Sequence, residues 1–189
     1  MSPAEKDARD ARSADSLIHA GRQHRCQQRR SAVTNPPIEQ YLSTHAFFSG
    51  LSPEFIGFLT RCASEQEIEP GAVLFRQGER AHQFYLIRSG IIVIEIPAIT
   101  GPTLQVQSLG ADQILGWSWL IPPYKWNFQA RAEVSTTLLA FDGDAVRDRC
   151  EAEPSFGYAL LKRFAALMAE RLEVARQKLM DQWNPPGFA

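Results

Sequence analysis

The chain has 189 residues and a mass of 21.2 kDa, which is enough for one domain with appendages. Apolar residues make up 44% and charged residues 22%, and the formal charge of −1 argues against a polybasic nucleic-acid-binding protein. No stretch approaches the roughly 18 apolar residues that span a bilayer, and no apolar signal segment opens the chain. The three cysteines are widely spaced, so we expect a cytoplasmic protein with reduced thiols and no membrane contact.

The first 37 residues differ in composition from the rest. They carry seven Lys or Arg against four Asp or Glu, and almost no large apolar side chain. Such a segment buries too little apolar surface to offset the entropy that it loses on ordering. We therefore predict a disordered N-terminal tail over 1–37, solvated rather than bound to an acidic partner or a nucleic acid.

Helical and then strand-like patterns follow. Apolar residues recur at helical spacing from Ile38, and Ser52-Pro53-Glu54 combines an N-cap, a first-turn proline and a carboxylate. Short runs rich in β-branched and aromatic residues, separated by turns about every ten residues, then predict an antiparallel β-sandwich, roll or barrel over about 65–142. The expected strands are 73–75, 84–87, 91–96, 103–107, 129–134 and 137–141.

The C-terminal part is helical. After a short helix over 144–150, apolar residues at steps of three and four predict a long helix over 154–183, ended by Asn184-Pro185-Pro186-Gly187. Residues 184–189 are then a C-terminal tail. A helix of this length extends beyond a domain of this size, so we expect its first half to pack on the sheet and its second half to pair with a second copy.

The order of these elements, together with a set of turn residues, resembles the cyclic nucleotide-binding domain of catabolite activators, protein kinase A regulatory subunits and gated channels. The resemblance covers about 40–183 and rests on Pro70-Gly71, Gly78-Glu79, Ser89-Gly90, Leu109-Gly110 with Asp112, Gly116, and the phrases Val73–Glu79, Phe84–Gly90 and Leu138–Asp142.

For residues 38–183, this resemblance implies an α+β domain. Its antiparallel, jelly-roll-like β-roll is flanked by short N-terminal helices and by a long C-terminal helix that moves on ligand binding and often forms the dimer interface. Relatives that regulate transcription add a helix-turn-helix domain, for which we expect no room here. We therefore expect a single-domain type that does not bind nucleic acid.

The segment that carries ligand contacts in this family departs from the pattern. In the family a Gly-Glu pair opens a short phosphate-binding helix, the glutamate accepts the ribose 2′-hydroxyl, and an arginine about nine residues later pairs with the phosphate. Here Gly116 is followed by Trp117, and Trp126 stands where the arginine should be. Trp119 takes the place of a small residue. Both principal nucleotide contacts are absent, which puts ordinary cAMP or cGMP binding in doubt.

Three interpretations stay open. The tryptophans and Tyr124 fill the pocket as extra core, which leaves a structural or adaptor protein that acts through dimerisation and protein contact. Alternatively, the pocket binds a changed effector by stacking, with part of the arginine's role taken by Lys125 or Arg131. A residual cyclic nucleotide site is the third. The candidate ligand-binding residues are Gly116, Trp117, Ser118, Trp119, Lys125, Trp126 and Arg131.

Enzymatic signatures are missing from the sequence. The four histidines have no metal-ligand spacing, and no nucleophile, zinc-protease or phosphate-loop motif occurs. Charge-rich runs such as Glu170-Arg171 are interpreted as solvated helix faces. We predict a non-enzymatic regulatory or sensor module without a metal, which couples a cyclic nucleotide, another small effector or a protein partner to its C-terminal helix.

Overall fold

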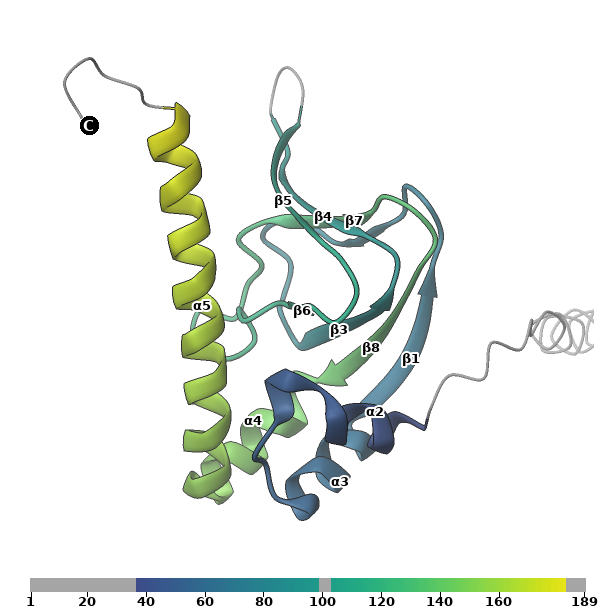
Figure 1. Ribbon diagram of the computed structural model, residues 1–189, viewed down its shortest axis with the longest axis vertical. Helices are drawn as coiled ribbons and strands as arrows, with labels where there is room; N and C mark the ends of the chain where they lie inside the picture. The colour runs from purple at the N-terminus through teal and green to yellow at the C-terminus, as the bar shows by residue number, and fades with distance from the viewer. Residues whose placement is uncertain (1–36, 99–102, 183–189) are drawn as a thin grey trace, which may run out of the picture. The chain divides into compact units, whose positions relative to one another are not determined.

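The computed structural model describes residues 37–98 and 103–182 (Figure 1). Its first elements are helix α2 (Ile38–Thr44), the 3-10 turn η1 (Ala46–Phe48) and helix α3 (Pro53–Arg61). The predicted start of α3 is confirmed, since the Ser52 hydroxyl accepts a hydrogen bond from the Phe55 amide at 3.3 Å and Pro53 is the first helical residue. The predicted disordered tail up to residue 36 and the tail 184–189 lie outside the described residues, as does Trp183.

The described strands form two four-stranded antiparallel sheets, in the orders β1-β8-β3-β6 and β2-β7-β4-β5, which confirms the predicted α+β roll. Two strands were not predicted. The first, β1, is a polar strand at a sheet edge, and β6 is only two residues long, so neither carries a periodic apolar signal. The strands are β1 (Ala63–Ile68), β2 (Val73–Phe75), β3 (Gln83–Ser89), β4 (Ile92–Ile96), β5 (Leu104–Leu109), β6 (Ile114–Leu115), β7 (Gln129–Ala132) and β8 (Thr136–Asp142).

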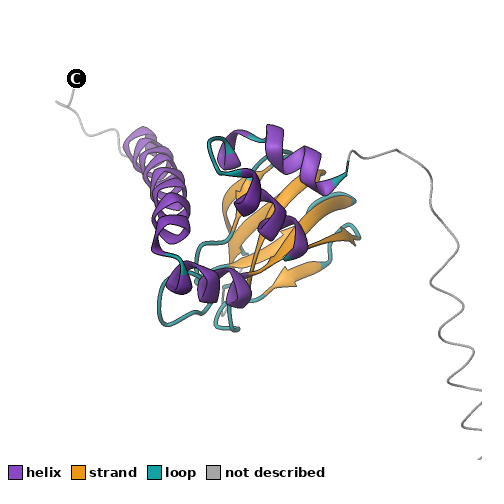
Figure 2. Ribbon diagram, turned by 90° about the horizontal axis from the view of Figure 1, so that it is seen from below, coloured by secondary structure: helices purple, strands orange, loops and turns teal. Residues whose placement is uncertain are grey.

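The sheet that contains β3 and β8 is covered on both faces. Phe84 of β3 stacks on Phe141 of β8 with ring centroids 4.5 Å apart, and it meets Phe164 of the C-terminal helix edge-on at 5.5 Å. The next residue, Tyr85, lies on the opposite face, where its ring is stacked 6.1 Å from that of Phe75. Because side chains alternate along a strand, one face of the sheet packs on helices and the other forms the interior of the roll. Figure 2 shows the helices outside the strands.

Two helices close the described chain, α4 (Gly143–Ala152) and the 29-residue α5 (Pro154–Gln182). In the first half of α5, Phe156, Leu160 and Phe164 are fully buried. In its second half, Leu172 and Leu179 are 71% and 66% exposed. The predicted packing of the first half on the roll is therefore confirmed, and Leu172 and Leu179 of the second half are largely uncovered in this single chain.

Gly90, in the turn between β3 and β4, provides a stability test. Its φ is +93°, and a Cβ there would lie 2.4 Å from the Thr136 hydroxyl and 2.6 Å from the Ser135 carbonyl oxygen. We expect Gly90→Ala to lower the free energy of unfolding by about 3 kcal/mol or more, because backbone strain and overlap add. Gly78→Ala is the control, since φ is +86° with nothing within 4 Å, and we expect a loss of about 1–2 kcal/mol. Urea unfolding measures both, and equal losses would contradict the role of the overlap.

Candidate functional site

The segment between β6 and β7 contains turns and no helix. The peptide between Pro122 and Pro123 is cis, and Tyr124 has a φ of +56°. Prolines lack the amide hydrogen that a helix interior needs, and the residue before a proline is disfavoured in the helical region. The short phosphate-binding helix that the family resemblance implies is therefore absent, and with it the helix N-terminus that would favour an anion.

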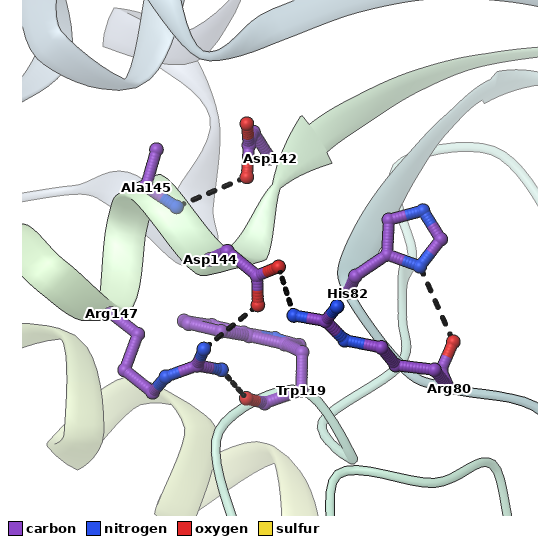
Figure 3. Close-up of polar contacts among 7 residues, drawn as sticks. All are labelled: Arg80, His82, Trp119, Asp142, Asp144, Ala145 and Arg147. Atoms are coloured by element: carbon purple, nitrogen blue, oxygen red, sulfur yellow. Dashed lines mark hydrogen bonds and ion pairs between the residues drawn. The ribbon is translucent and has the colours of Figure 1, made fainter.

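Trp119 belongs to the core on the helix side of the sheet. It is fully buried, its ring stacks on Phe84 at 5.0 Å, and it meets Phe164 edge-on at 5.5 Å. Its backbone carbonyl accepts a hydrogen bond from Nη1 of Arg147 at 3.0 Å (Figure 3). Trp119 anchors the turn against the helices and does not line a ligand cavity, so its assignment to the binding site is corrected.

A charged network at the start of α4 supports this anchor. Asp144 accepts from Nη2 of Arg147 at 2.8 Å and from Nη2 of Arg80 at 2.6 Å (Figure 3). Asp142 caps the helix by accepting the Ala145 amide hydrogen at 3.0 Å. These contacts tie the Trp119 backbone, through Arg147, to the beginning of α4.

Trp126 lies inside the roll, at the position of the family's arginine. Trp126 is only 5% exposed. Its ring stacks on Phe75 with centroids 3.8 Å apart and planes 10° from parallel. Gly116 makes room for this indole, because a Cβ on Gly116 would lie 2.8 Å from it, and the φ of +91° also favours glycine. The interior that a phosphate and its arginine would share therefore holds an aromatic stack.

A cavity of about 310 Å³ nevertheless remains between the roll, α5 and the segment 116–128 between β6 and β7, here called the cassette segment. Four of the seven predicted site residues line it, namely Gly116, Trp117, Ser118 and Trp126. The other walls are apolar or uncharged except at Arg171. They are formed by Phe75, Ile94, Val106, Gln107, Leu115, Asn127 and Phe128 of the roll and by Met168, Arg171, Leu172 and Ala175 of α5. The sequence did not predict this contribution from α5.

Lys125 and Arg131 do not line the cavity. Lys125 is exposed. Arg131 alternates along β7 with the buried Ala130 and Ala132, and it pairs with Glu95, the Nη2 to Oε2 distance being 3.3 Å. The prediction that either residue takes over the arginine's role at the site is corrected, because strand alternation directs Arg131 to the other face of its sheet.

Arg171 is the charged residue of the cavity. Its guanidinium carbon lies 5.2 Å from the centroid of the Trp117 ring, and its Nη2 donates to the Ile114 carbonyl oxygen. Burial lowers the pKa of Arg171 to about 10, against a smaller opposite effect of the Glu170 carboxylate. Within the described part of the chain, no carboxylate lies within ion-pair distance of Arg171.

A sequence signal for Arg171 exists. Arg171 follows Phe164 by seven residues and Leu167 by four, so it continues the stripe of α5 that packs on the roll. Its interpretation as part of a solvated face is wrong, because burial is set by the stripe rather than by the charge of neighbouring residues.

Comparison with known proteins agrees with this fold. Residues 65–153 match the family model of the cyclic nucleotide-binding domain. The CRP-like cAMP-activated global transcriptional regulator of Mycobacterium tuberculosis is 24% identical over 144 residues, which cover 76% of this chain and 62% of that protein. This chain therefore matches less than two thirds of that regulator's length.

Solved structures show the same architecture. A cyclic nucleotide-binding domain from Methylobacillus flagellatus has a TM-score of 0.66 at 16% identity and covers 80% of this chain and 85% of its own. The catabolite activator protein of Thermus thermophilus has a TM-score of 0.57 at 25% identity and covers 70% of this chain and 61% of its own. Residues 65–153, which contain most of the β-roll, thus match the cyclic nucleotide-binding domain, and the fold is the one seen in CRP-like regulators.

Among residues 37–98 and 103–182, no group of three histidine, cysteine or carboxylate side chains is placed to hold a metal ion. In the same ranges, none of the helices is long and apolar enough to span a membrane.

Proposed function

We propose that this chain is a non-enzymatic regulatory module whose effector binds in the cavity between the β-roll and α5. One observation carries the proposal: the cavity is bordered both by the cassette residues Gly116–Ser118 and by Met168, Arg171, Leu172 and Ala175 of α5. A ligand there contacts the segment that recognises nucleotides in the family and, at the same time, the helix that transmits the signal. Occupancy of the cavity therefore changes the contacts of α5.

The two halves of α5 are held differently, which supports this coupling. The first half is fixed by buried aromatic and aliphatic side chains of the core. The second half reaches the roll through Arg171, which donates to Ile114, and through Lys178, whose Nζ lies 3.4 Å from the Val106 carbonyl oxygen. Polar contacts of long, partly solvated side chains hold less firmly than core packing. The second half is thus the part of α5 that a ligand displaces or fixes most easily.

Ordinary cyclic nucleotides fit this site poorly. The ribose acceptor of the family is replaced by Trp117, and the phosphate-binding arginine is replaced by Trp126, which is stacked in the core. Each lost charge-assisted hydrogen bond weakens binding by about 1.5–3 kcal/mol. We expect millimolar cAMP or cGMP to leave the melting temperature nearly unchanged. A low-micromolar dissociation constant by calorimetry would contradict this expectation.

The proposal itself is tested with a neutral aromatic probe, 2-naphthamide, by calorimetry and hydrogen exchange. We expect binding to the unmodified protein and slower amide exchange in residues 168–179 of the complex. Val106→Phe adds a ring to the cavity wall at a partly exposed position and should abolish binding without unfolding the roll. Binding that is unaffected by Val106→Phe, or that leaves exchange in α5 unchanged, would overturn the proposed site.

We also propose that α5 pairs with its copy in a homodimer. Most of its exposed apolar positions fall on two series with a spacing of seven residues or a multiple of seven. One series has Tyr158, Leu172 and Leu179, and the other has Leu161, the partly buried Met168 and Ala175, while Val174 and Met180 fall outside both. A repeat of seven is the signature of a two-helix seam. The seam lies beside the buried stripe of Phe156, Leu160 and Phe164 on the helix, and Met168, Leu172 and Ala175 of the seam also border the cavity.

The alternative of an adaptor with a filled pocket has its own support. Trp119 and Trp126 are both buried, one in each core of the domain, as that interpretation predicts for part of the aromatic cluster. In an adaptor the remaining cavity has no ligand, so neither neutral nor charged aromatic probes bind. The binding experiment with Val106→Phe therefore separates the two functions.

A further inference from the structure

We propose that the effector is a flat, apolar molecule with a single carboxylate, which pairs with Arg171 at the α5 wall of the cavity. This inference rests on the proposed function, because it names the chemical class of ligand for the same site.

Arg171 is a cation without a carboxylate partner in the described chain. A guanidinium has five N–H donors, and in the described chain Arg171 donates to the Ile114 carbonyl oxygen and lies over the Trp117 ring. Six arginines of the described chain form an ion pair with a carboxylate, whereas Arg171, the charged residue that lines this cavity, forms none there. A partly buried cation without an anion is unfavourable, so a ligand carboxylate that accepts two of the free donors is stabilised there.

The remaining walls of the cavity are aromatic, aliphatic or uncharged. Phe75, Trp117, Trp126 and Phe128 provide aromatic surface, and the polar lining residues besides Arg171 are the uncharged Gln107, Ser118 and Asn127. Aromatic walls favour a planar apolar body that stacks on them. Because one lining residue carries a positive charge, the site matches one negative charge rather than the several charges of a nucleoside di- or triphosphate.

The volume of the cavity limits the size of the ligand. A volume of about 310 Å³ lies near the lower end of small-molecule sites, which span about 300–1,000 Å³. The space suits a body of about two fused rings with one acid group. Arg171 follows Met168 and precedes Leu172 on the same wall, so the acid is held by α5 while the apolar body lies against the roll.

The experiment compares 2-naphthoate with the neutral, nearly isosteric 2-naphthamide by calorimetry. We expect the unmodified protein to bind the acid about tenfold or more tightly than the amide. In Arg171→Gln this preference should disappear while the affinity for the amide changes less than about threefold. Lys178→Gln is the matched control, since Lys178 also reaches the roll from α5 but does not line this cavity, and the preference should persist.

The outcomes separate this inference from the proposed function. Equal affinities for acid and amide in the unmodified protein would overturn the assignment to an anionic ligand and leave the cavity as an effector site. Failure of both probes to bind would overturn the proposed function as well. If Lys178→Gln also lost the preference for the acid over the amide, the preference would come from general surface charge, which would contradict the role of Arg171. If Arg171→Gln does not fold, the role of Arg171 is judged from the ratio of the acid and amide affinities, measured in the unmodified protein and in Arg171→Lys.

Discussion

Replacing Trp119 with alanine is expected to lower the free energy of unfolding by about 3–5 kcal/mol. The indole is fully buried between Phe84 and Phe164, so its removal takes away a large apolar surface and leaves a cavity among aromatic rings. The same change loosens the turn whose carbonyl binds Arg147. Urea unfolding followed by circular dichroism measures the loss.

Trp117→Ala is the matched control for this prediction. Trp117 is two residues away and partly exposed, and it lines the cavity at the edge of the core. We expect a stability loss of less than about 2 kcal/mol, because less apolar surface is removed from a buried site, together with weaker binding of the aromatic probes. Equal stability losses in the two variants would contradict the assignment of Trp119 to the core and Trp117 to the site.

The second large effect concerns assembly. We expect the double variant Leu161→Glu with Leu179→Glu to be monomeric at concentrations at which the unmodified protein sediments as a dimer. The two leucines are 48% and 66% exposed on the same face of α5, and neither lines the cavity. In a two-helix seam the new carboxylates are desolvated without a partner, at several kcal/mol each. The roll should stay folded, as its melting transition will show.

Gln177→Glu serves as the control for charge. Gln177 is exposed and lies on α5 away from both apolar series, so a carboxylate added there should leave the dimer intact. Sedimentation velocity at micromolar concentration compares the three proteins. A monomeric unmodified protein, or dissociation by Gln177→Glu alone, would show that the apolar series of α5 is not the dimer interface.

Local patterns in the sequence predicted most of the fold. The N-cap at Ser52, the β-branched run of β4 and the apolar spacing of α5 act over a few residues, so they are legible without the tertiary structure. The loss of the family's glutamate and arginine was equally visible, because it is a matter of residue identity at Trp117 and Trp126. The short strand β6 was not predicted, because it is defined by its pairing with β3 rather than by its own sequence.

Which residues line the cavity could be determined only from the tertiary structure. The sequence identified a cluster of aromatic residues, but three tryptophans within ten residues lie in three places: Trp119 in the helix-side core, Trp126 inside the roll and Trp117 at the cavity. It also proposed Lys125 and Arg131 as replacement cations, whereas the cation at the cavity is Arg171, more than fifty residues beyond Gly116. Periodicity determines which face of an element is buried, but which surface that face meets depends on how α5 packs across the roll, and no local pattern specifies that contact.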